Sequence, residues 1–239
     1  MKPVVQAVLF DLDGTLIDTA PDFIRIIRVM CQKHQHPIPS DADIREQVSA
    51  GARAMVRLMF GDELANVADT DEQLLAYRQE FLDLYEQDIC VDSRLFDGLD
   101  RLLTSLENQG VPWGIVTNKP RYLAENLLAK LDLSDRCGVL VCPDDVANTK
   151  PDPEPMFLAV DRLNQQLGCA IQSEYCIYVG DHIRDIQAGN AAGMTTVVAK
   201  FGYLSRADKE SLHEWGADVL MDTPDELADW VLAQLTQQS

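Results

Sequence analysis

Residues 4–15 read VVQAVLFDLDGT. The apolar part, residues 4–10, is rich in β-branched side chains and has no helical periodicity. This pattern is typical of a strand that is buried on both faces of a sheet. Asp11, Asp13 and Gly14 follow the run directly, so the segment predicts a central strand that ends at a cluster of polar groups.

Further apolar runs without helical periodicity follow along the chain, and helical patterns lie between them. One such pattern places Leu99, Leu102, Leu103 and Leu106 on one helix face. Alternating strands and helices predict a parallel sheet covered on both sides, that is, a doubly wound α/β fold. The runs are residues 113–117, 139–142, 176–179, 195–199 and 218–221.

The interval from residue 19 to residue 91 breaks this alternation, because it contains helical patterns and no convincing strand. The first helix has Thr19 and Asp22 in capping-box spacing, with Pro21 in its first turn. Another helix is expected from about residue 71 to residue 87. The simplest explanation is a compact helical insertion after the first strand.

We therefore expect two domains. Residues 1–17 and 93–239 form the α/β core, and residues 18–92 form a small inserted helical cap. The hinges are expected near residues 16–19 and 91–95, where the insertion leaves and rejoins the core.

Composition narrows the classes of function. The chain has 239 residues, of which 46% are hydrophobic, so it can bury a large core. Its net charge of −19 repels nucleic acid and acidic membranes. No segment approaches the roughly 20 apolar residues of a membrane helix, and no signal peptide is evident. The six cysteines are scattered, which indicates reduced thiols. We expect a cytoplasmic monomer or homodimer without a nucleic-acid or membrane partner.

Carboxylates follow two of the predicted strands, and ligands of open parallel sheets bind where the strands end. Asp11 and Asp13 lie two residues apart on an extended segment, so one can attack while the other handles protons. Asp181 and Asp185 are four residues apart and share one face of a helix start. These four carboxylates repel one another unless a hard cation lies among them, and oxygen ligands suit Mg²⁺.

Groups that suit a phosphate follow two further strands. Thr117 and Asn118 enter a helix whose N-terminus favours an anion. Lys150 lies in the stretch TKPDP, where two prolines stiffen the loop that carries the amine.

The ordered set DLDGT, the Thr117 motif, the Lys150 motif and GDHIRD resembles the four motifs of the haloacid dehalogenase superfamily, in its phosphatase branch. The resemblance covers nearly the whole chain. It implies a Rossmann-like core with a helical cap, as well as a phosphatase that uses Mg²⁺.

The resemblance also implies roles for individual residues. Asp11 is the nucleophile and a metal ligand, and Asp13 is the general acid and then the general base. The main-chain carbonyl of Asp13 reaches the metal. Asp181 ligates Mg²⁺, and Asp185 supports the site from the ligand shell. The implied phosphoryl-binding residues are Thr117, Asn118 and Lys150.

Substrate choice is expected to lie in the cap, where the loop SAGAR ends at Arg53. Arg53 is placed to bind a carboxylate or hydroxyl of the substrate, although a surface arginine is an open alternative. The chain resembles phosphoglycolate phosphatases. Several stretches are more similar to a bacterial subgroup that acts on N-acetylmuramic acid 6-phosphate in cell-wall recycling, namely GARAMV, WGIVTNKP, CPDDVANTKPDPEP and WGADV.

Two other classes of function are alternatives. A sugar-phosphate mutase resembling β-phosphoglucomutase uses the same nucleophile and the same acid/base pair. A non-catalytic binding module would have lost the nucleophile, a metal ligand or the lysine, and all of these are present here. The leading hypothesis is hydrolysis of a small phosphorylated metabolite.

Overall fold

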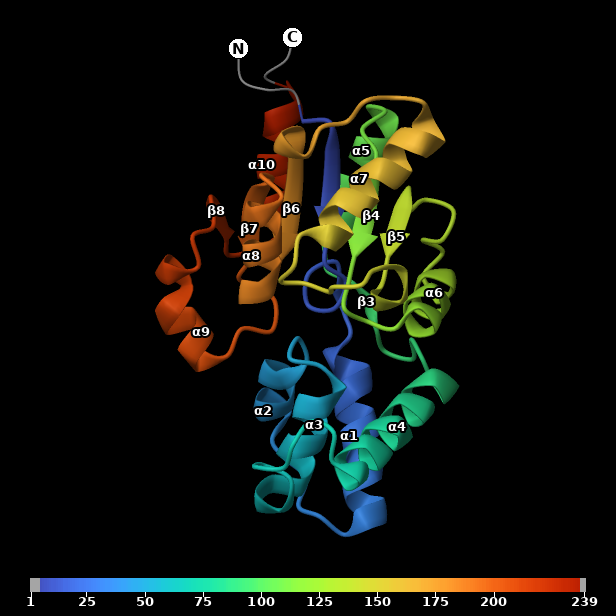
Figure 1. Cartoon of the computed structure of the whole chain (residues 1–239), viewed down its shortest axis with the longest axis vertical. Helices are drawn as coiled ribbons and strands as arrows, with labels where there is room; N and C mark the ends of the chain where they lie inside the picture. Colours follow the sequence, from blue (N-terminus) through green and yellow to red (C-terminus); the bar gives the residue numbers. More distant parts are fainter. Residues whose placement is uncertain (1–4, 237–239) are drawn as a thin grey trace.

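The computed structural model describes residues 5–236. Figure 1 shows two lobes, one built around a parallel sheet and one made of helices. The sheet has six strands in the order β5-β4-β1-β6-β7-β8, and every pairing is parallel. The predicted α/β class is therefore confirmed. The strands are β1 (Ala7–Phe10), β4 (Trp113–Val116), β5 (Val139–Val141), β6 (Cys176–Gly180), β7 (Thr195–Ala199) and β8 (Val219–Met221).

The later strands begin and end within one residue of the predicted runs. The first strand is shorter than predicted, because it begins at Ala7, and Val4 lies outside the described residues. Its side chains alternate between the two faces. Val8 and Phe10 face the core beneath α5 (Leu99–Asn108) and α10 (Pro224–Thr236).

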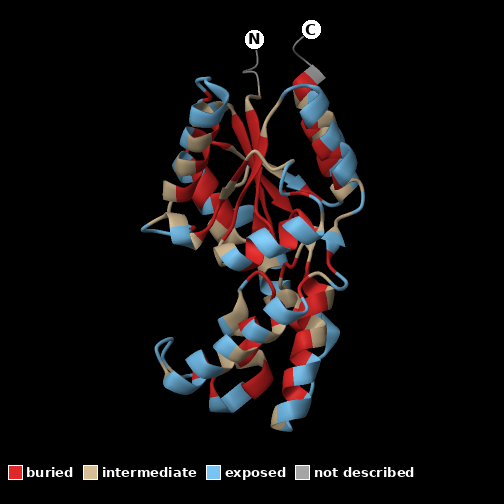
Figure 2. Cartoon of the chain, turned by 90° about the vertical axis from the view of Figure 1, so that its right-hand side faces the viewer, coloured by how far each residue is buried: buried red, intermediate tan, exposed pale blue. Residues whose placement is uncertain are grey.

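On the opposite face, Ala7 and Leu9 pack with side chains of α7 (Glu154–Leu167) and α8 (Ile183–Ala191). Figure 2 shows most residues of the central strands buried between these layers, and every residue of β1, β4 and β6 is buried. Burial on both faces explains why β1 is continuously apolar instead of alternating. The core lobe is completed by α6 (Arg121–Lys130) and α9 (Arg206–Ser211).

The helical lobe consists of α1 (Ala20–His34), α2 (Asp41–Gln47), α3 (Ala52–Phe60) and α4 (Glu72–Gln87). It lies beyond the carboxyl ends of the strands, toward which the arrowheads in Figure 1 point. The apolar stripes of α1 and α4 meet edge to face, with the ring of Phe23 5.5 Å from Phe81 and 4.7 Å from Tyr85. Each helix thus buries one face inside the lobe, as Figure 2 shows.

The two chain connections to the helical lobe run side by side as a short antiparallel ribbon. β2 (Ile17–Asp18) pairs with β3 (Arg94–Leu95) where the hinges were predicted. Asp18 accepts a hydrogen bond from the Tyr203 hydroxyl at 2.7 Å, and Arg45 of α2 donates to the same carboxylate at 3.1 Å. Asp18 is therefore a junction residue between the lobes.

The predicted capping box at the start of α1 is wrong. Thr19 is the N-cap residue but makes no side-chain capping bond. Its hydroxyl donates instead to Asp13 at 2.7 Å. The buried Asp22 carboxylate accepts from the Ser93 hydroxyl at 2.5 Å and from the Ser93 main-chain N–H at 3.0 Å. Both side chains are recruited by tertiary partners, which outcompete local capping.

Two further features of the structure concern its cysteines and its helices. All six cysteines are free thiols. Within residues 5–236, no helix combines the length and the apolar character needed to cross a bilayer.

We expect Asp22→Ala to lower the free energy of unfolding by about 1–3 kcal/mol, because the Ser93 hydroxyl and N–H would lose their acceptor in a buried position. Chemical denaturation at neutral pH measures this difference. Asp43→Ala is the matched control, since that carboxylate belongs to the exposed first turn of α2. Equal stability of the two variants would contradict the assigned role of Asp22.

Candidate active site

A cavity of about 340 Å³ lies between the helical lobe and the carboxyl ends of the strands. The core lines it with Asp11, Asp13 and Thr117, and the helical lobe contributes Arg53 and Phe81. Open α/β sheets bind ligands at this edge, because the strand ends and the loops after them converge there.

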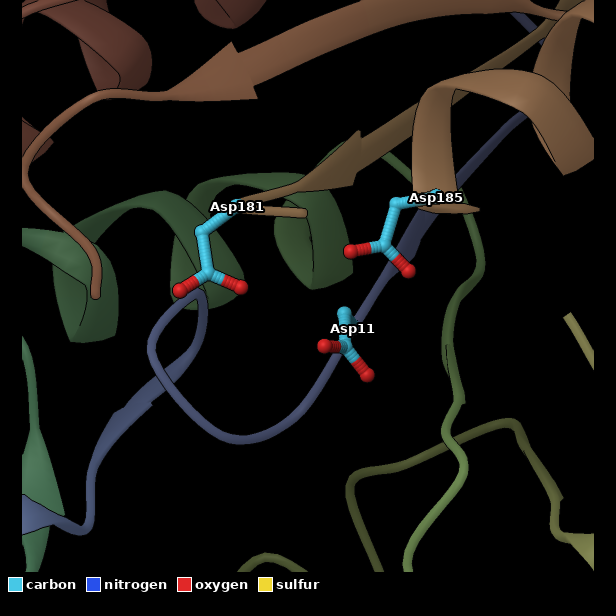
Figure 3. Close-up of side chains that lie close together, drawn as sticks. All are labelled: Asp11, Asp181 and Asp185. Carbon is cyan, nitrogen blue, oxygen red and sulfur yellow. The ribbon is translucent and has the colours of Figure 1, made fainter. Parts of the chain in front are cut away.

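Three carboxylates converge beside this cavity. Asp11 follows β1, Asp181 follows β6, and Asp185 lies in the first turn of α8. Each offers an oxygen within 4.8 Å of the other two, and Figure 3 shows them pointing toward a common space. All three side chains are buried. The structure thus brings together three of the four carboxylates that the sequence singled out.

Lys150 supplies the positive charge of this cluster. Its Nζ lies 2.8 Å from Asp11 Oδ1 and 2.7 Å from Asp185 Oδ1. It also lies 2.8 Å from both the Val116 carbonyl oxygen and the Tyr178 hydroxyl. Only 3% of Lys150 is exposed, so the ammonium depends on these partners in place of water.

The carboxylates differ in protonation. Burial alone raises the pKa of Asp11, but the charges of Lys150 and Arg184 outweigh burial and hold this pKa below its ordinary value of 3.8. Burial, together with the charges of Asp11 and Asp185, raises the pKa of Asp181 to about 8. Burial also raises the pKa of Asp185, against the opposing effect of Lys150. One lysine therefore does not neutralise the whole cluster.

The donor set fits a divalent cation that prefers oxygen ligands. Asp181 Oδ1 is buried and has no hydrogen-bond partner among the described residues. Its other oxygen accepts from the Ser49 hydroxyl at 2.7 Å and from the Tyr203 main-chain N–H at 2.8 Å. A cation held by Asp11, Asp181 and Asp185 would satisfy the orphaned oxygen and relieve the mutual repulsion.

Gly14 allows the loop after β1 to approach Asp181. Its φ is +82°, a conformation that residues with a Cβ rarely adopt. A Cβ at this position would also lie 2.2 Å from Asp181 Oδ2. The glycine of DLDGT therefore serves both the turn and the close packing of the site.

The Asp13 side chain has partners other than those of Asp11, although both residues line the cavity. Asp13 Oδ1 accepts from the Thr19 hydroxyl at 2.7 Å, and Lys119 Nζ lies 3.0 Å and 3.3 Å from the two Asp13 oxygens. Asp13 is thus held beside the carboxylate cluster without belonging to it.

Thr117 and Asn118 both line the cavity. The Thr117 hydroxyl accepts from the Lys119 main-chain N–H at 3.1 Å, and Asn118 Nδ2 donates to the Lys150 carbonyl at 3.1 Å. Helix α6 begins at Arg121, so Thr117 is not its N-cap. The second and third motifs are therefore tied directly to each other.

The sequence did not predict the side-chain contacts of three residues that shape the site. Ser49 reaches Asp181 from the helical lobe, and Arg184 donates to the Ser49 carbonyl oxygen. Lys119 pairs with Asp13. All three lie inside quoted motifs or loops, but the direction of a side chain there depends on contacts from distant segments.

His182 is the N-cap residue of α8. Its Nδ1 accepts from the Arg184 main-chain N–H at 3.2 Å, as the N-cap of α8. Burial and the nearby charge of Arg184 lower the pKa of His182 to about 4, so the ring is neutral and can accept this bond.

The chain matches the family model described as haloacid dehalogenase-like hydrolase over residues 8–199. It is 44% identical to the N-acetylmuramic acid 6-phosphate phosphatase of Pseudomonas aeruginosa, and the alignment covers 94% of each chain. It is 41% identical to the phosphoglycolate phosphatase of Xanthomonas campestris pv. campestris, over 93% of this chain and 94% of that one. A solved structure from Lactobacillus delbrueckii subsp. bulgaricus has the same fold, with a TM-score of 0.78 at 21% identity over 95% and 98% of the two chains.

The fold, the site and the relatives together define the class of enzyme. The chain is a phosphatase, an enzyme that hydrolyses phosphoric monoesters. The chain belongs to the haloacid dehalogenase-like hydrolase family.

The raised pKa of Asp181 predicts how stability depends on pH. Because the folded metal-free protein binds this proton more tightly than the unfolded chain does, its free energy of unfolding should fall as the pH rises from 3.8 to about 8. Added Mg²⁺ should restore more stability near the upper end of this range, where it no longer competes with the proton.

Melting temperatures in a chelator, and then in Mg²⁺, measure this effect. Asp181→Asn is the control, because its amide does not titrate. The unaltered protein should lose more stability than the variant as the pH rises. Parallel curves for the two proteins would contradict the assignment.

Proposed function

We propose that this phosphatase is Mg²⁺-dependent and acts on a small phosphorylated metabolite through a phosphoryl group carried on Asp11. The observation that carries the proposal is the buried Asp11 carboxylate. The ammonium of Lys150, 2.8 Å from Asp11 Oδ1, keeps it ionised, and an Asp11 oxygen lies within 4.8 Å of oxygens of Asp181 and Asp185. A carboxylate is a sufficient nucleophile once its repulsion with phosphate is offset.

In the first step, the Asp11 carboxylate attacks phosphorus and the bond from phosphorus to the ester oxygen breaks. Lys150 binds Asp11 Oδ1, which leaves Oδ2 to form the new bond. Asp13 gives its proton to the departing alcohol. A bound Mg²⁺ would be held by Asp11, Asp181 and Asp185, with the Asp13 main-chain carbonyl as the further ligand that the family resemblance implies, and would neutralise phosphoryl charge.

In the second step, water attacks the phosphorus of the aspartyl-phosphate, and Asp13 accepts the proton of that water. Inorganic phosphate leaves, and the Asp11 carboxylate is restored. Thr117, Asn118 and Lys150 line or adjoin the cavity and are proposed to hold the phosphoryl oxygens in both steps. Splitting hydrolysis in this way replaces one difficult step with two easier ones.

The cap side of the cavity supports a substrate with a second anionic group. Arg53 and Arg78 both line the cavity, and neither guanidinium makes a hydrogen bond or an ion pair with another described residue. In a chain of net charge −19, these two arginines give this side of the cavity a local positive charge. Phe81, Leu82 and Leu123 line the same cavity with apolar surface.

This arrangement favours a sugar acid phosphate as the substrate, and we place N-acetylmuramic acid 6-phosphate first. A cavity of about 340 Å³ falls within the range of sites for ligands larger than a two-carbon acid. Phosphoglycolate is the second candidate substrate, because a relative that is 41% identical is named phosphoglycolate phosphatase. We further propose residues 18–92 as the cap that closes over the substrate. The cytoplasmic location and the monomeric or dimeric state remain predictions.

Phosphate release across a substrate panel tests the proposed function. The panel contains N-acetylmuramic acid 6-phosphate, 2-phosphoglycolate, glucose 6-phosphate and 4-nitrophenyl phosphate, each with Mg²⁺ and with a chelator. We expect N-acetylmuramic acid 6-phosphate to exceed glucose 6-phosphate about a hundredfold in kcat/KM, or about 2.7 kcal/mol. Full activity in the chelator would refute the metal assignment, and an isomeric phosphate in place of free phosphate would indicate a mutase.

Arg53→Ala and Arg78→Ala should each lower kcat/KM for the carboxylated substrate by about tenfold to a hundredfold, the usual value of a charged hydrogen bond. Hydrolysis of 4-nitrophenyl phosphate should change much less, since that ester has no carboxylate. Arg94→Ala is the matched control, because Arg94 is exposed on β3 and does not line the cavity. Equal losses on both esters would remove these arginines from carboxylate recognition.

A further inference from the structure

Lys119 has an environment that phosphate binding does not explain. It lies two residues after Thr117, is 7% exposed, and lines the cavity. Its ammonium contacts both oxygens of Asp13, at 3.0 Å and 3.3 Å. Among the described residues, Asp13 is its only ion-pair partner. The lysine is therefore directed at the proposed acid/base group and not at Asp11.

Two aromatic rings of the helical lobe cover the same ammonium. Lys119 Nζ lies 4.9 Å from the centre of the Phe23 ring and 4.5 Å from that of Tyr85. Phe23 belongs to α1 and Tyr85 to α4, whereas Lys119 precedes α6 of the core lobe. Cation–π contacts act over such distances and strengthen when water is excluded. Lys119 is thus a core residue whose surroundings are completed by the cap.

The Asp13 carboxylate is constrained from two sides. The Thr19 hydroxyl donates to Oδ1 at 2.7 Å, from the junction between the lobes. Lys119 spans both oxygens from the core. Two donors from different segments fix the plane of the carboxylate, which determines where its proton can be delivered.

We propose that Lys119 is a positioning residue that orients Asp13 for proton transfer, and that the Phe23 and Tyr85 rings hold Lys119 in place when the cap covers the site. This inference rests on the proposed function and adds a residue to it. It connects the placement of the cap to the proton transfers, in addition to any role in excluding water.

The choice of ester separates this role from a structural one. Release of an alcohol needs a proton from Asp13, whereas 4-nitrophenolate is a stable anion and leaves without one. Loss of Lys119 should therefore slow phosphoryl transfer from an alkyl phosphate and spare transfer from 4-nitrophenyl phosphate. A lysine that bound the phosphoryl group, or only stabilised the fold, would affect both esters alike.

The test compares single-turnover rates of Lys119→Met on N-acetylmuramic acid 6-phosphate, or on 2-phosphoglycolate if the panel selects it, with the initial burst of 4-nitrophenol. The rate of phosphoryl transfer from the alkyl ester should fall about a hundredfold, which is the lower end of the range for general acid catalysis. The rate of the 4-nitrophenol burst should fall less than about threefold. Lys119→Arg keeps the positive charge, so its rate on the alkyl ester should be about tenfold higher than that of Lys119→Met. Lys130→Met, at an exposed lysine in the last turn of α6, is the matched control.

Tyr85 tests the contribution of the cap. Its hydroxyl has no hydrogen-bond partner among the described residues, so Tyr85→Phe keeps the ring contact and Tyr85→Leu removes it. Tyr85→Leu should be at least about threefold slower than Tyr85→Phe on the alkyl ester alone. Equal behaviour of these two variants would overturn the role of the ring.

Equal losses on both esters in Lys119→Met, or no loss, would overturn the role of Lys119. Thermal melts of all variants identify any that fail to fold, and the charge-restoring Lys119→Arg then carries the comparison. An unaltered enzyme inactive on every ester would instead contradict the proposed function, and this inference with it.

Discussion

Three buried carboxylates repel one another, and the rest of the structure must hold them together and offset this repulsion. At an effective dielectric constant near 20, two ionised carboxylates within 4.8 Å repel by at least about 3.5 kcal/mol. Lys150 compensates Asp11 and Asp185 directly, while Asp181 has no cationic partner within residues 5–236 and has a pKa raised to about 8. The folded chain therefore contains a site that additional positive charge would stabilise. A phosphoryl group is also anionic, so the same positive charge would favour its binding.

The fold explains how such a costly arrangement persists. Asp11 and Asp181 lie at the ends of strands that are buried on both faces, so their main chains are held by the sheet and not by the site. Asp185 is held by the first turn of α8. Gly14 lets the loop after β1 approach Asp181. Ser49 then joins the helical lobe to the cluster through its bond to Asp181. The helical lobe thus contacts the carboxylate cluster and, through Phe23 and Tyr85 on Lys119, also the proposed acid/base group.

Much of this was predictable because the determinants are local. A buried parallel strand needs a continuous apolar run, and the polar residues after each run mark the edge where ligands bind. The side-chain partners were not predictable, since each depends on a distant segment. Thr19 and Asp22 have the spacing of a capping box, yet the Thr19 hydroxyl binds Asp13, and Asp22 binds Ser93 on the return connection. Lys119 stands beside a recognised motif, but its aromatic neighbours come from two helices of the helical lobe, α1 and α4.

The proposed reaction proceeds through a phosphoryl group on Asp11. Rapid acid quenching during turnover, followed by peptide mass spectrometry, detects such an intermediate. We expect the added mass of one phosphoryl group on the peptide that contains Asp11, localised to that residue, and no such adduct in Asp11→Asn. A phosphoryl group on another residue, or full turnover in Asp11→Asn, would contradict the proposed reaction.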